Sequence, residues 1–210
     1  MAEVVIVDYG AGNVRSMQNA LEHVAASGQR VRLTADAQAI RGAERIVLPG
    51  VGAFGECRRK MAEAGVLEPL FDAVRGGTPF LGVCVGMQIL ADRGEEFGAH
   101  DGFGWIPGVT RRIPLPEDSA LKLPHIGWAP ITLPAPHALF DGIAADAHFY
   151  FVHSYFLDCA EPVDVAATVV HGIPFTAAVA RRNVFGCQFH PEKSDDPGIR
   201  LLENFCRWRL

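Results

Sequence analysis

Cys84 is the residue of this chain best placed to act as a nucleophile. It stands in the middle of Gly-Val-Cys-Val-Gly, residues 82–86, where an apolar run typical of a buried strand changes to a helical pattern. A nucleophile held in a tight strand-to-helix turn leaves no room for side chains two positions away, which explains Gly82 and Gly86. The pattern predicts a nucleophile elbow with cysteine in place of serine. The alternative is a structural cysteine whose glycines only let a helix pack closely on a strand.

The predicted elbow would also help a thiol electrostatically. In open α/β folds such a turn lies at the carboxyl end of the sheet, where ligands bind. The start of the following helix favours a thiolate, and the backbone N–H of Val85 would point toward negative charge that develops in a reaction. Val85 is therefore the first predicted oxyanion donor.

His190, near the end of the chain, could serve as the base for this thiol. It stands in "FGCQFHPEKS", where an apolar strand pattern ends just before a proline. Glu192 follows two residues later, and in extended backbone residues i and i+2 point the same way, so its carboxylate could hold the imidazole ring. Cysteine, histidine and acid together follow the logic of a catalytic triad. Taken alone, His-Pro-Glu would instead favour an exposed loop with a solvated ion pair.

A glycine-rich segment, "LPGVGAFGE" at residues 48–56, ends another buried strand. Glycine permits backbone conformations that turn N–H groups toward a ligand, so Gly50 and Gly52 could lie beside the elbow and supply a second oxyanion donor. No G-K-[ST] follows, which excludes a nucleotide P-loop and leaves a flexible turn as the alternative.

The remaining cysteines and histidines form no recognisable site. We expect structural thiols at Cys57, Cys159, Cys187 and Cys206, and ordinary core or surface histidines at His125, His137, His148 and His171. His153 lies on an aromatic strand pattern and is expected to make packing or backbone contacts. Because no second ligand pair accompanies Cys187-x-x-His190, we expect no metal site.

Strand and helix patterns alternate over the first ninety-odd residues. Strands are expected near residues 3–9, 30–34, 44–50 and 78–84, and helices over 13–27, 56–65, 66–77 and 86–94. This alternation predicts an α/β fold with an open, mostly parallel sheet and helices on both faces. Beyond Gly94 short strands follow one another, and a hairpin-like return at Arg182-Asn183 indicates antiparallel additions in the C-terminal half. A closing helix is expected to begin at the Asp-Pro pair, residues 196–197.

Length and composition limit what such a fold could do. A chain of 210 residues, 49% of them hydrophobic, can bury a substantial core, and we expect residues 1–210 to form a single domain. The net charge of −5, without a basic patch, argues against nucleic acid or an anionic membrane as partner. The N-terminal segment has no signal-peptide pattern, so we expect a cytoplasmic protein with reduced cysteines.

Taken together, these motifs resemble those of the class I (triad) glutamine amidotransferases. The shared features are Cys84 in "GVCVGMQ", "FHPEKS" and the glycine loop. The segments "VDYGAGNVRS", "LPGVGAFGE", "LPHIGWAPI" and "FYFVHSY" are most similar to the branch formed by the glutaminase subunits of imidazole glycerol phosphate synthase. The resemblance covers essentially the whole chain. It implies hydrolysis of the glutamine side-chain amide without a metal or organic cofactor, and delivery of ammonia to a (β/α)8-barrel cyclase subunit for histidine biosynthesis.

The resemblance also implies a role for each matching position. Cys84 would be the nucleophile, His190 the general base and acid, and Glu192 the carboxylate that orients it, with backbone N–H groups of Val85 and Gly52 as the oxyanion hole. L-glutamine would be bound at Gly50, Gln88, His153, Ser154 and Tyr155, and the cyclase would be met at Asn13, Trp128 and Lys193. The family commonly has asparagine after H-x-G-W, whereas Ala129-Pro130 follows Trp128 in this chain.

Three alternatives stay open from the sequence. A triad glutaminase that feeds another synthase would share Cys84, His190 and Glu192, and only the flanking motifs separate it. A cysteine peptidase or chaperone of similar architecture would use an elbow thiol but would have no use for Gln88. A non-catalytic subunit could keep the fold and only regulate a partner, although the complete set of three residues argues against that.

Overall fold

A seven-stranded sheet forms the centre of the molecule. The computed structural model describes residues 2–10, 14–116 and 118–209. The strand order is β11-β12-β13-β4-β3-β1-β2. Five neighbouring strands are parallel: β1 (Ala2–Val7), β2 (Gln29–Thr34), β3 (Arg45–Gly50), β4 (Phe80–Cys84) and β13 (Val184–Cys187). Two strands, β12 (Ile173–Arg181) and β11 (Val165–His171), continue the sheet in antiparallel fashion. The predicted α/β class, with a mostly parallel sheet and antiparallel additions, is confirmed.

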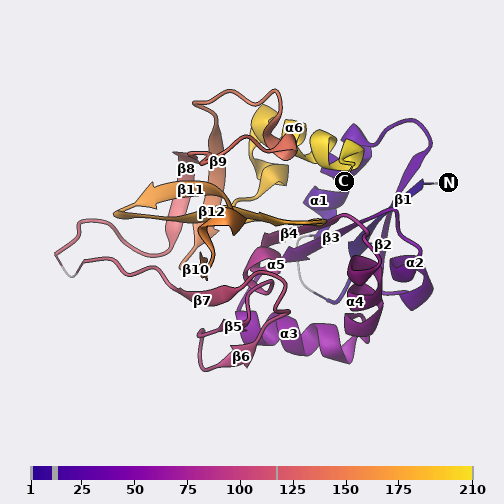
Figure 1. Cartoon of the computed structure of the whole chain (residues 1–210), viewed down its shortest axis with the longest axis horizontal. Helices are drawn as coiled ribbons and strands as arrows, with labels where there is room; N and C mark the ends of the chain where they lie inside the picture. Colours follow the sequence, from indigo (N-terminus) through magenta and orange to yellow (C-terminus); the bar gives the residue numbers. More distant parts are fainter. Residues whose placement is uncertain (1, 11–13, 117, 210) are drawn as a thin grey trace.

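Helices cover both faces of this sheet (Figure 1). On one face, α1 (Val14–Val24) packs against the C-terminal α6 (Asp195–Arg207). On the other face lie α3 (Phe54–Glu63), α4 (Leu67–Arg75) and the one-turn α5 (Val85–Gln88), and the short α2 (Ala37–Arg41) packs beside α4. Because the central strands are covered on both sides, they carry the continuous apolar runs seen in the sequence.

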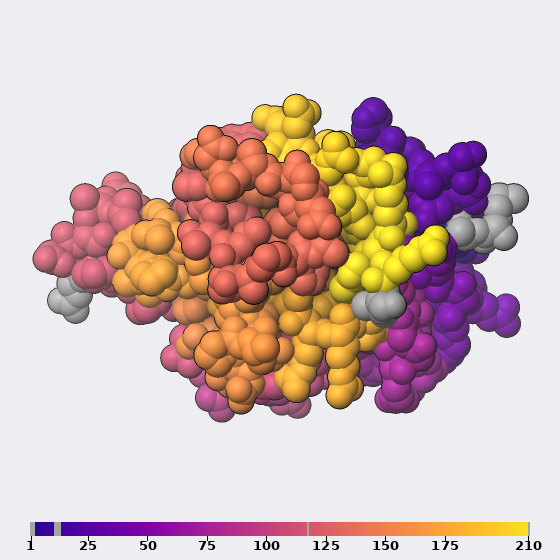
Figure 2. All heavy atoms as spheres, turned by 45° about the horizontal axis from the view of Figure 1, so that its top comes forward, coloured from indigo at the N-terminus to yellow at the C-terminus, as the bar shows by residue number. Residues whose placement is uncertain are grey.

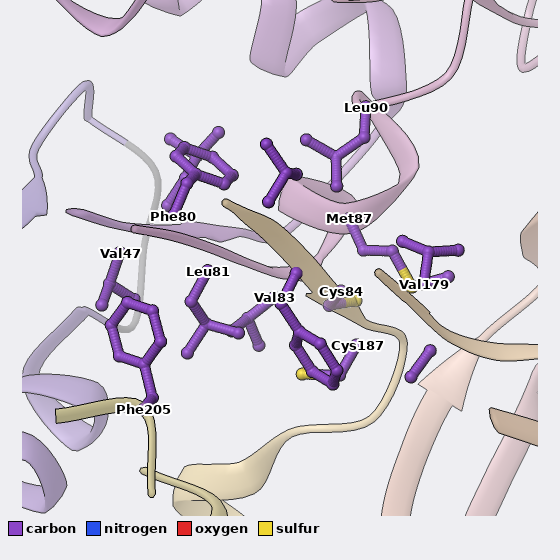
Figure 3. Close-up of a cluster of buried hydrophobic side chains, with 14 of the residues drawn as sticks. Val47, Phe80, Leu81, Val83, Cys84, Met87, Leu90, Val179, Cys187 and Phe205 are labelled. Carbon is purple, nitrogen blue, oxygen red and sulfur yellow. The ribbon is translucent and has the colours of Figure 1, made fainter. Parts of the chain in front are cut away.

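Alternate residues of β4 point to opposite faces and anchor the core (Figure 3). Phe80 lies on the side of Met87 and Leu90, whereas Leu81 and Val83 lie on the side of Phe205. This alternation is the ordinary period-two geometry of a strand. Cys84 stands at the end of β4, where α5 begins.

Two smaller sheets extend the molecule beside the carboxyl ends of the parallel strands. One has the order β10-β7-β5-β6, built from Tyr155–Cys159, Gly108–Arg112, Arg93–Gly94 and His100–Asp101. The other pairs β8 (His125–Pro130) with β9 (His148–His153), and 3₁₀ turns occupy Ala138–Phe140, Pro162–Asp164 and Pro191–Lys193. The connection between β7 and β8 projects from the body of the molecule (Figure 2). No helix within the described ranges has both the length and the apolar character needed to cross a bilayer.

The helix expected over residues 86–94 is much shorter than predicted. It ends at Gln88 because the next carbonyls are taken by a later loop rather than by a continuing helix. The N–H groups of Phe103, Gly104 and Trp105 donate to the carbonyls of Ile89, Ala91 and Leu90, at 2.8, 3.0 and 3.0 Å. This tertiary contact overrides the local helical pattern, and local sequence does not reveal it.

Smaller differences between the predicted and the observed helices and strands lie elsewhere in the chain. The sequence did not indicate α2, and the aromatic strand pattern at residues 148–158 is two strands separated at Ser154. The last helix begins at Asp195, one residue before the predicted Asp-Pro pair. The predicted hairpin return is confirmed, since Arg181 pairs with Val184 and Arg182 has a φ of 55°.

Arg45, which is only 5% exposed, ties the end of α6 to the sheet. Its Nε donates to the carbonyl of Phe205 at 2.9 Å and its Nη2 to that of Trp208 at 2.8 Å. We expect Arg45→Met to keep the aliphatic packing but remove the side-chain donor from the Trp208 carbonyl and one of the two donors from the Phe205 carbonyl, which also accepts from the N–H of Trp208. The free energy of unfolding should fall by about 2–3 kcal/mol in urea titrations. Arg41→Met is the matched control, because its partly exposed pair with Asp72 contributes less than about 1 kcal/mol. Equal losses in the two variants would contradict this role of Arg45.

Candidate active site

Cys84 occupies a strained backbone position at the end of β4. Its φ and ψ are 56° and −113°, in the left-handed half of conformational space that non-glycine residues rarely adopt. Such a conformation costs on the order of 1–3 kcal/mol and persists only where the surroundings enforce it. The residue is buried, at the junction of β4 and α5. The chain therefore has the predicted strand-to-helix elbow.

Three glycines enforce this elbow by allowing backbone segments to touch. A Cβ on Gly82 would collide with the carbonyl oxygen of Gly86, and a Cβ on Gly86 would collide with that of Leu48 in β3. A Cβ on Gly50 would lie 2.6 Å from the backbone nitrogen of Gly86. All these obstacles are backbone atoms and cannot rotate away, so the predicted reason for the flanking glycines is confirmed.

His190 and Glu192 form a buried, hydrogen-bonded pair beside the elbow. His190 Nδ1 lies 2.9 Å from Glu192 Oε1, and both side chains are about 5% exposed. Glu192 reaches the ring from a 3₁₀ turn over Pro191–Lys193, not from extended backbone as the sequence argument assumed. The turn is held by Ser194, whose hydroxyl donates to the carbonyl of His190. The backbone N–H of His190 donates to Tyr150 at 2.9 Å, which fixes this segment against β9.

The surroundings of His190 favour the protonated form of its imidazole. Burial by itself lowers the pKa of His190, but hydrogen bonds and charge interactions with Cys84 and Glu192 outweigh it and raise the pKa to about 9. His190 is therefore protonated near neutral pH when a thiolate faces it. Glu192 Oε2 has no hydrogen-bond partner among the described residues, so its interaction with His190 is the main compensation for burying this carboxylate.

The glycine loop after β3 is held from behind by two side chains. Tyr9 Oη donates to the carbonyl of Pro49 at 2.8 Å, and Cys57 Sγ lies 3.4 Å from the carbonyl oxygen of Val51. In a trans peptide the carbonyl and the next N–H point in opposite directions, so the N–H of Gly52 points away from Cys57. Gly52 has a φ of 102°, which favours glycine at this position.

A cavity of about 530 Å³ opens beside the sulfur and the imidazole. Its size is within the usual range of small-molecule sites. The predicted site residues that line it are Gly52, Cys84, Val85, Gln88, His153, Ser154, Tyr155 and His190. Gly50 is not among the lining residues and instead packs against Gly86 and Val85. The lining also includes Glu96 and Arg112, which our sequence argument missed because neither belongs to a recognisable motif.

Gln88 is fixed by two hydrogen bonds from the same amide nitrogen. Its Nε2 donates to the carbonyl of Tyr155 at 2.9 Å and to Gln188 Oε1 at 3.0 Å. Both amide hydrogens are used internally, and Oε1 is the atom that can accept from a ligand in the cavity. The Tyr155 carbonyl also receives His153 Nδ1 at 2.8 Å, so it is already occupied.

The profile of the family described as glutamine amidotransferase class-I matches residues 5–208. The chain belongs to this family. Imidazole glycerol phosphate synthase subunit HisH of Caulobacter vibrioides is 48% identical over 213 residues, covering 100% of both chains. The subunit of the same name from Rhodospirillum rubrum is 48% identical over 211 residues, covering 98% of each.

Solved structures share the fold of this amidotransferase. A crystal structure of glutamine amidotransferase superposes with a TM-score of 0.71 at 18% identity, covering 97% of this chain and 99% of that one. The structure of PurLQS from Thermotoga maritima gives a TM-score of 0.72 at 18% identity, covering 98% of each.

Two of the three residues expected at the partner interface lie together on the amidotransferase surface. Trp128, 48% exposed, packs edge-on against Tyr150 with ring centroids 5.9 Å apart. Lys193 Nζ lies 6.0 Å from the centroid of the same ring. Asn13 lies outside the described residues. Ala129 and Pro130 continue β8 in register with β9, so the departure from the family pattern leaves the strand intact.

The other cysteines and histidines of the amidotransferase form no second centre. All five cysteines are free thiols, and no group of three potential metal ligands occurs within the described part of the chain. His125 is buried between Phe151 and His171, with ring centroids 4.9 and 4.4 Å away, and it contacts His153. His148 is exposed.

We expect Gly86→Ala to disrupt the elbow, because its Cβ would meet the carbonyl of Leu48. The free energy of unfolding should fall by about 3 kcal/mol, as for an overpacked core, and alkylation of Cys84 should slow. Gly76→Ala is the matched control, since Gly76 has a φ of −73° at the end of α4 and its nearest neighbours are 3.3 Å away. An unfolding midpoint in Gly86→Ala equal to that of the control would refute the steric argument.

Removing the thiol should lower the pKa of His190, because the imidazolium loses one of its two partners. In Cys84→Ala we expect the NMR titration midpoint of His190 to fall clearly below the wild-type value of about 9. His137, whose pKa is lowered by burial against Phe140, Phe185 and Trp208, serves as the internal control, and its titration should be the same in the variant. A wild-type pKa above the ordinary 6.5 means that protonation of His190 stabilises the fold below pH 6.5 and that this contribution is lost as the pH rises to about 9. An unchanged midpoint in the variant would show that Cys84 does not hold the imidazolium.

Proposed function

We propose that this chain is the glutaminase subunit of an imidazole glycerol phosphate synthase, which hydrolyses the side-chain amide of glutamine and delivers the ammonia to a cyclase. The observation that carries the proposal is the buried Cys84–His190–Glu192 arrangement at the wall of a cavity, in a chain 48% identical over its full length to HisH subunits. Hydrolysis of glutamine and a place in histidine biosynthesis follow from that relationship.

The cavity suits a free amino acid. Glu96 and Arg112 give its lining one carboxylate and one guanidinium, which are complementary to the α-ammonium and α-carboxylate of a zwitterion. Gln88 Oε1 adds a neutral acceptor. With backbone groups at Ser154 and Tyr155, these side chains would orient glutamine so that its side-chain amide reaches the sulfur.

In the first half of the reaction His190 takes the thiol proton and Cys84 attacks the carboxamide carbon. The oxyanion that forms would be held by the backbone N–H groups of Val85 and Gly52. Loss of one such donor typically costs on the order of a hundred-fold in rate. His190 then gives its proton to the departing nitrogen, which leaves as ammonia, and a thioester remains on Cys84.

The second half repeats this chemistry with water. His190 draws a proton from the water as its oxygen attacks the thioester carbon, and the carbon–sulfur bond breaks to release glutamate. Glu192 keeps the imidazole oriented through both halves because it accepts from Nδ1. No step draws on a group from outside the chain other than water.

Ammonia must then reach a second protein. We infer a (β/α)8-barrel cyclase subunit as the partner, and the face formed by Trp128, Tyr150 and Lys193 as part of the surface that meets it. The support is the exposed Trp128 beside the turn that carries Glu192, together with the name of the relatives as subunits of a synthase. We also infer a single-domain enzyme that works in the cytoplasm, supported by the full-length similarity to synthase subunits.

Release of glutamate from glutamine tests the function directly. We expect glutamate release by the chain with its cyclase partner, and loss of release by at least a thousand-fold in Cys84→Ala. Complex formation by Cys84→Ala, measured by ultracentrifugation, is the control that the variant still folds and docks. No release under any condition, with the complex intact, would favour a purely regulatory subunit.

A further inference from the structure

The nucleophile has less help from its helix than an elbow usually provides. A helix macrodipole needs several aligned peptide units, and α5 contains only four residues, Val85–Gln88. A buried thiolate at Cys84 therefore depends on individual donors around the sulfur. His190 is one of them, and the structure contains a second.

The side-chain amide of Gln188, just after β13, donates to the sulfur of Cys84. Gln188 is fully buried, and its backbone N–H donates to Ala177 at 2.8 Å. Its Nε2 lies 3.7 Å from Cys84 Sγ, within the longer range of hydrogen bonds to sulfur. The residue stands two positions before His190, and no local sequence pattern marks it as part of the site.

The orientation of this amide is fixed by Gln88. Gln88 Nε2 donates to Gln188 Oε1 at 3.0 Å, so the oxygen of Gln188 faces Gln88 and its NH₂ group faces the sulfur. In the opposite orientation the amide oxygen would face a thiolate and repel it. Gln88 also donates to the Tyr155 carbonyl, which prevents it from rotating.

The same chain of hydrogen bonds continues outward to β8. His153 Nδ1 lies 2.8 Å from the Tyr155 carbonyl, so it carries the proton and leaves Nε2 to accept from His125 Nδ1, 3.3 Å away. Burial lowers the pKa of His125 to about 4 and that of His153 to about 3, and both rings are neutral near pH 7. The neutral His125–His153 pair thus holds in place the Tyr155 carbonyl that accepts from Gln88.

We propose that Gln188 is a catalytic residue whose amide N–H donates to the Cys84 sulfur, and that Gln88 is the positioning residue that aims it. The contact stabilises the thiolate before attack. When the thioester is hydrolysed, the electron pair of the breaking carbon–sulfur bond returns to sulfur, and Gln188 donates to the thiolate that leaves. The role in turnover rests on the glutaminase function above, whereas the effect on the thiol itself does not.

Other titratable groups around the sulfur could also affect the pH dependence of Cys84 alkylation. They are His190, with Glu192 behind it, and the buried Tyr9, Cys57 and Cys187. Burial raises the pKa of Tyr9, Cys57 and Cys187 above their ordinary values, so these groups are neutral near pH 7. Glu96 and Arg112 line the same cavity as Cys84, and neither they nor the His190–Glu192 pair is changed in the variants below.

The test measures alkylation of Cys84 by iodoacetamide from pH 5 to 10, read by mass spectrometry of the Cys84 peptide, without glutamine or partner. In Gln188→Met we expect the midpoint to rise by about one pH unit and the rate at pH 7 to fall about tenfold, as for loss of one hydrogen bond to a charged group. With the cyclase present, kcat for glutamate release should fall about tenfold while KM changes little.

Thr110→Val is the matched control, because it tests whether loss of any buried hydrogen bond near α5 shifts the alkylation midpoint. Thr110 is fully buried and its Oγ1 donates to the backbone carbonyl of Gln88 at 2.8 Å, so this variant loses a buried hydrogen bond to the end of α5 without a change next to the sulfur. Its alkylation midpoint should stay at the wild-type value. A wild-type midpoint in Gln188→Met, or an equal shift in Thr110→Val, would overturn the proposal.

Gln88→Met provides an independent test that leaves Gln188 in place. It should shift the midpoint in the same direction, because Gln188 is then free to rotate, and the double variant should shift it by less than the sum. Unchanged alkylation in Gln88→Met would remove Gln88 from the proposal, and fully additive shifts would show that the two residues do not act in series. If the chain releases glutamate but the variants show no shift in the alkylation midpoint, only this inference is overturned. If the midpoints shift but the chain releases no glutamate under any condition, only the proposed function is overturned.

Discussion

Backbone contact between Gly86 and the carbonyl of Leu48 brings β3, β4 and α5 together at one point, and the other features of the site depend on it. It lets α5 turn back over the sheet and forces Cys84 into its left-handed conformation. The same close contact between β3 and α5 places Gly50 against Gly86, and this brings the glycine loop to the edge of the cavity. The strain at the nucleophile is thus the local cost of a packing arrangement that serves three elements at once.

Electrostatic balance around the sulfur is the second constraint. Cys84, His190 and Glu192 are all nearly inaccessible to water, so each charge must be matched by a neighbour within hydrogen-bond reach. The imidazolium satisfies the carboxylate on one side and the thiolate on the other. The neutral amide of Gln188 supplies a further donor to the sulfur without adding another buried charge.

The local sequence predicted the elements that carry chemistry and failed where distant segments decide the structure. The elbow and the His-Pro-Glu turn are encoded within a few residues each, so the types and spacing of Cys84, His190 and Glu192 were sufficient to identify them. The end of α5 at Gln88 depends on a loop at residues 103–105, and the amide of Gln188 meets the sulfur only because β13 lies next to β4. Glu96 and Arg112 reach the cavity from separate elements, and no short pattern joins them.

Tyr150 links His190 to the outer surface through a single residue. Its backbone carbonyl accepts from the N–H of His190, its backbone N–H donates to the hydroxyl oxygen of Ser194, and its ring contacts both Trp128 and Lys193. A change that reshapes this face therefore also acts on the segment that carries His190. Over evolutionary time the outer surface and the buried site cannot diverge independently at Tyr150, and its backbone has to be preserved while the exposed rim around it varies.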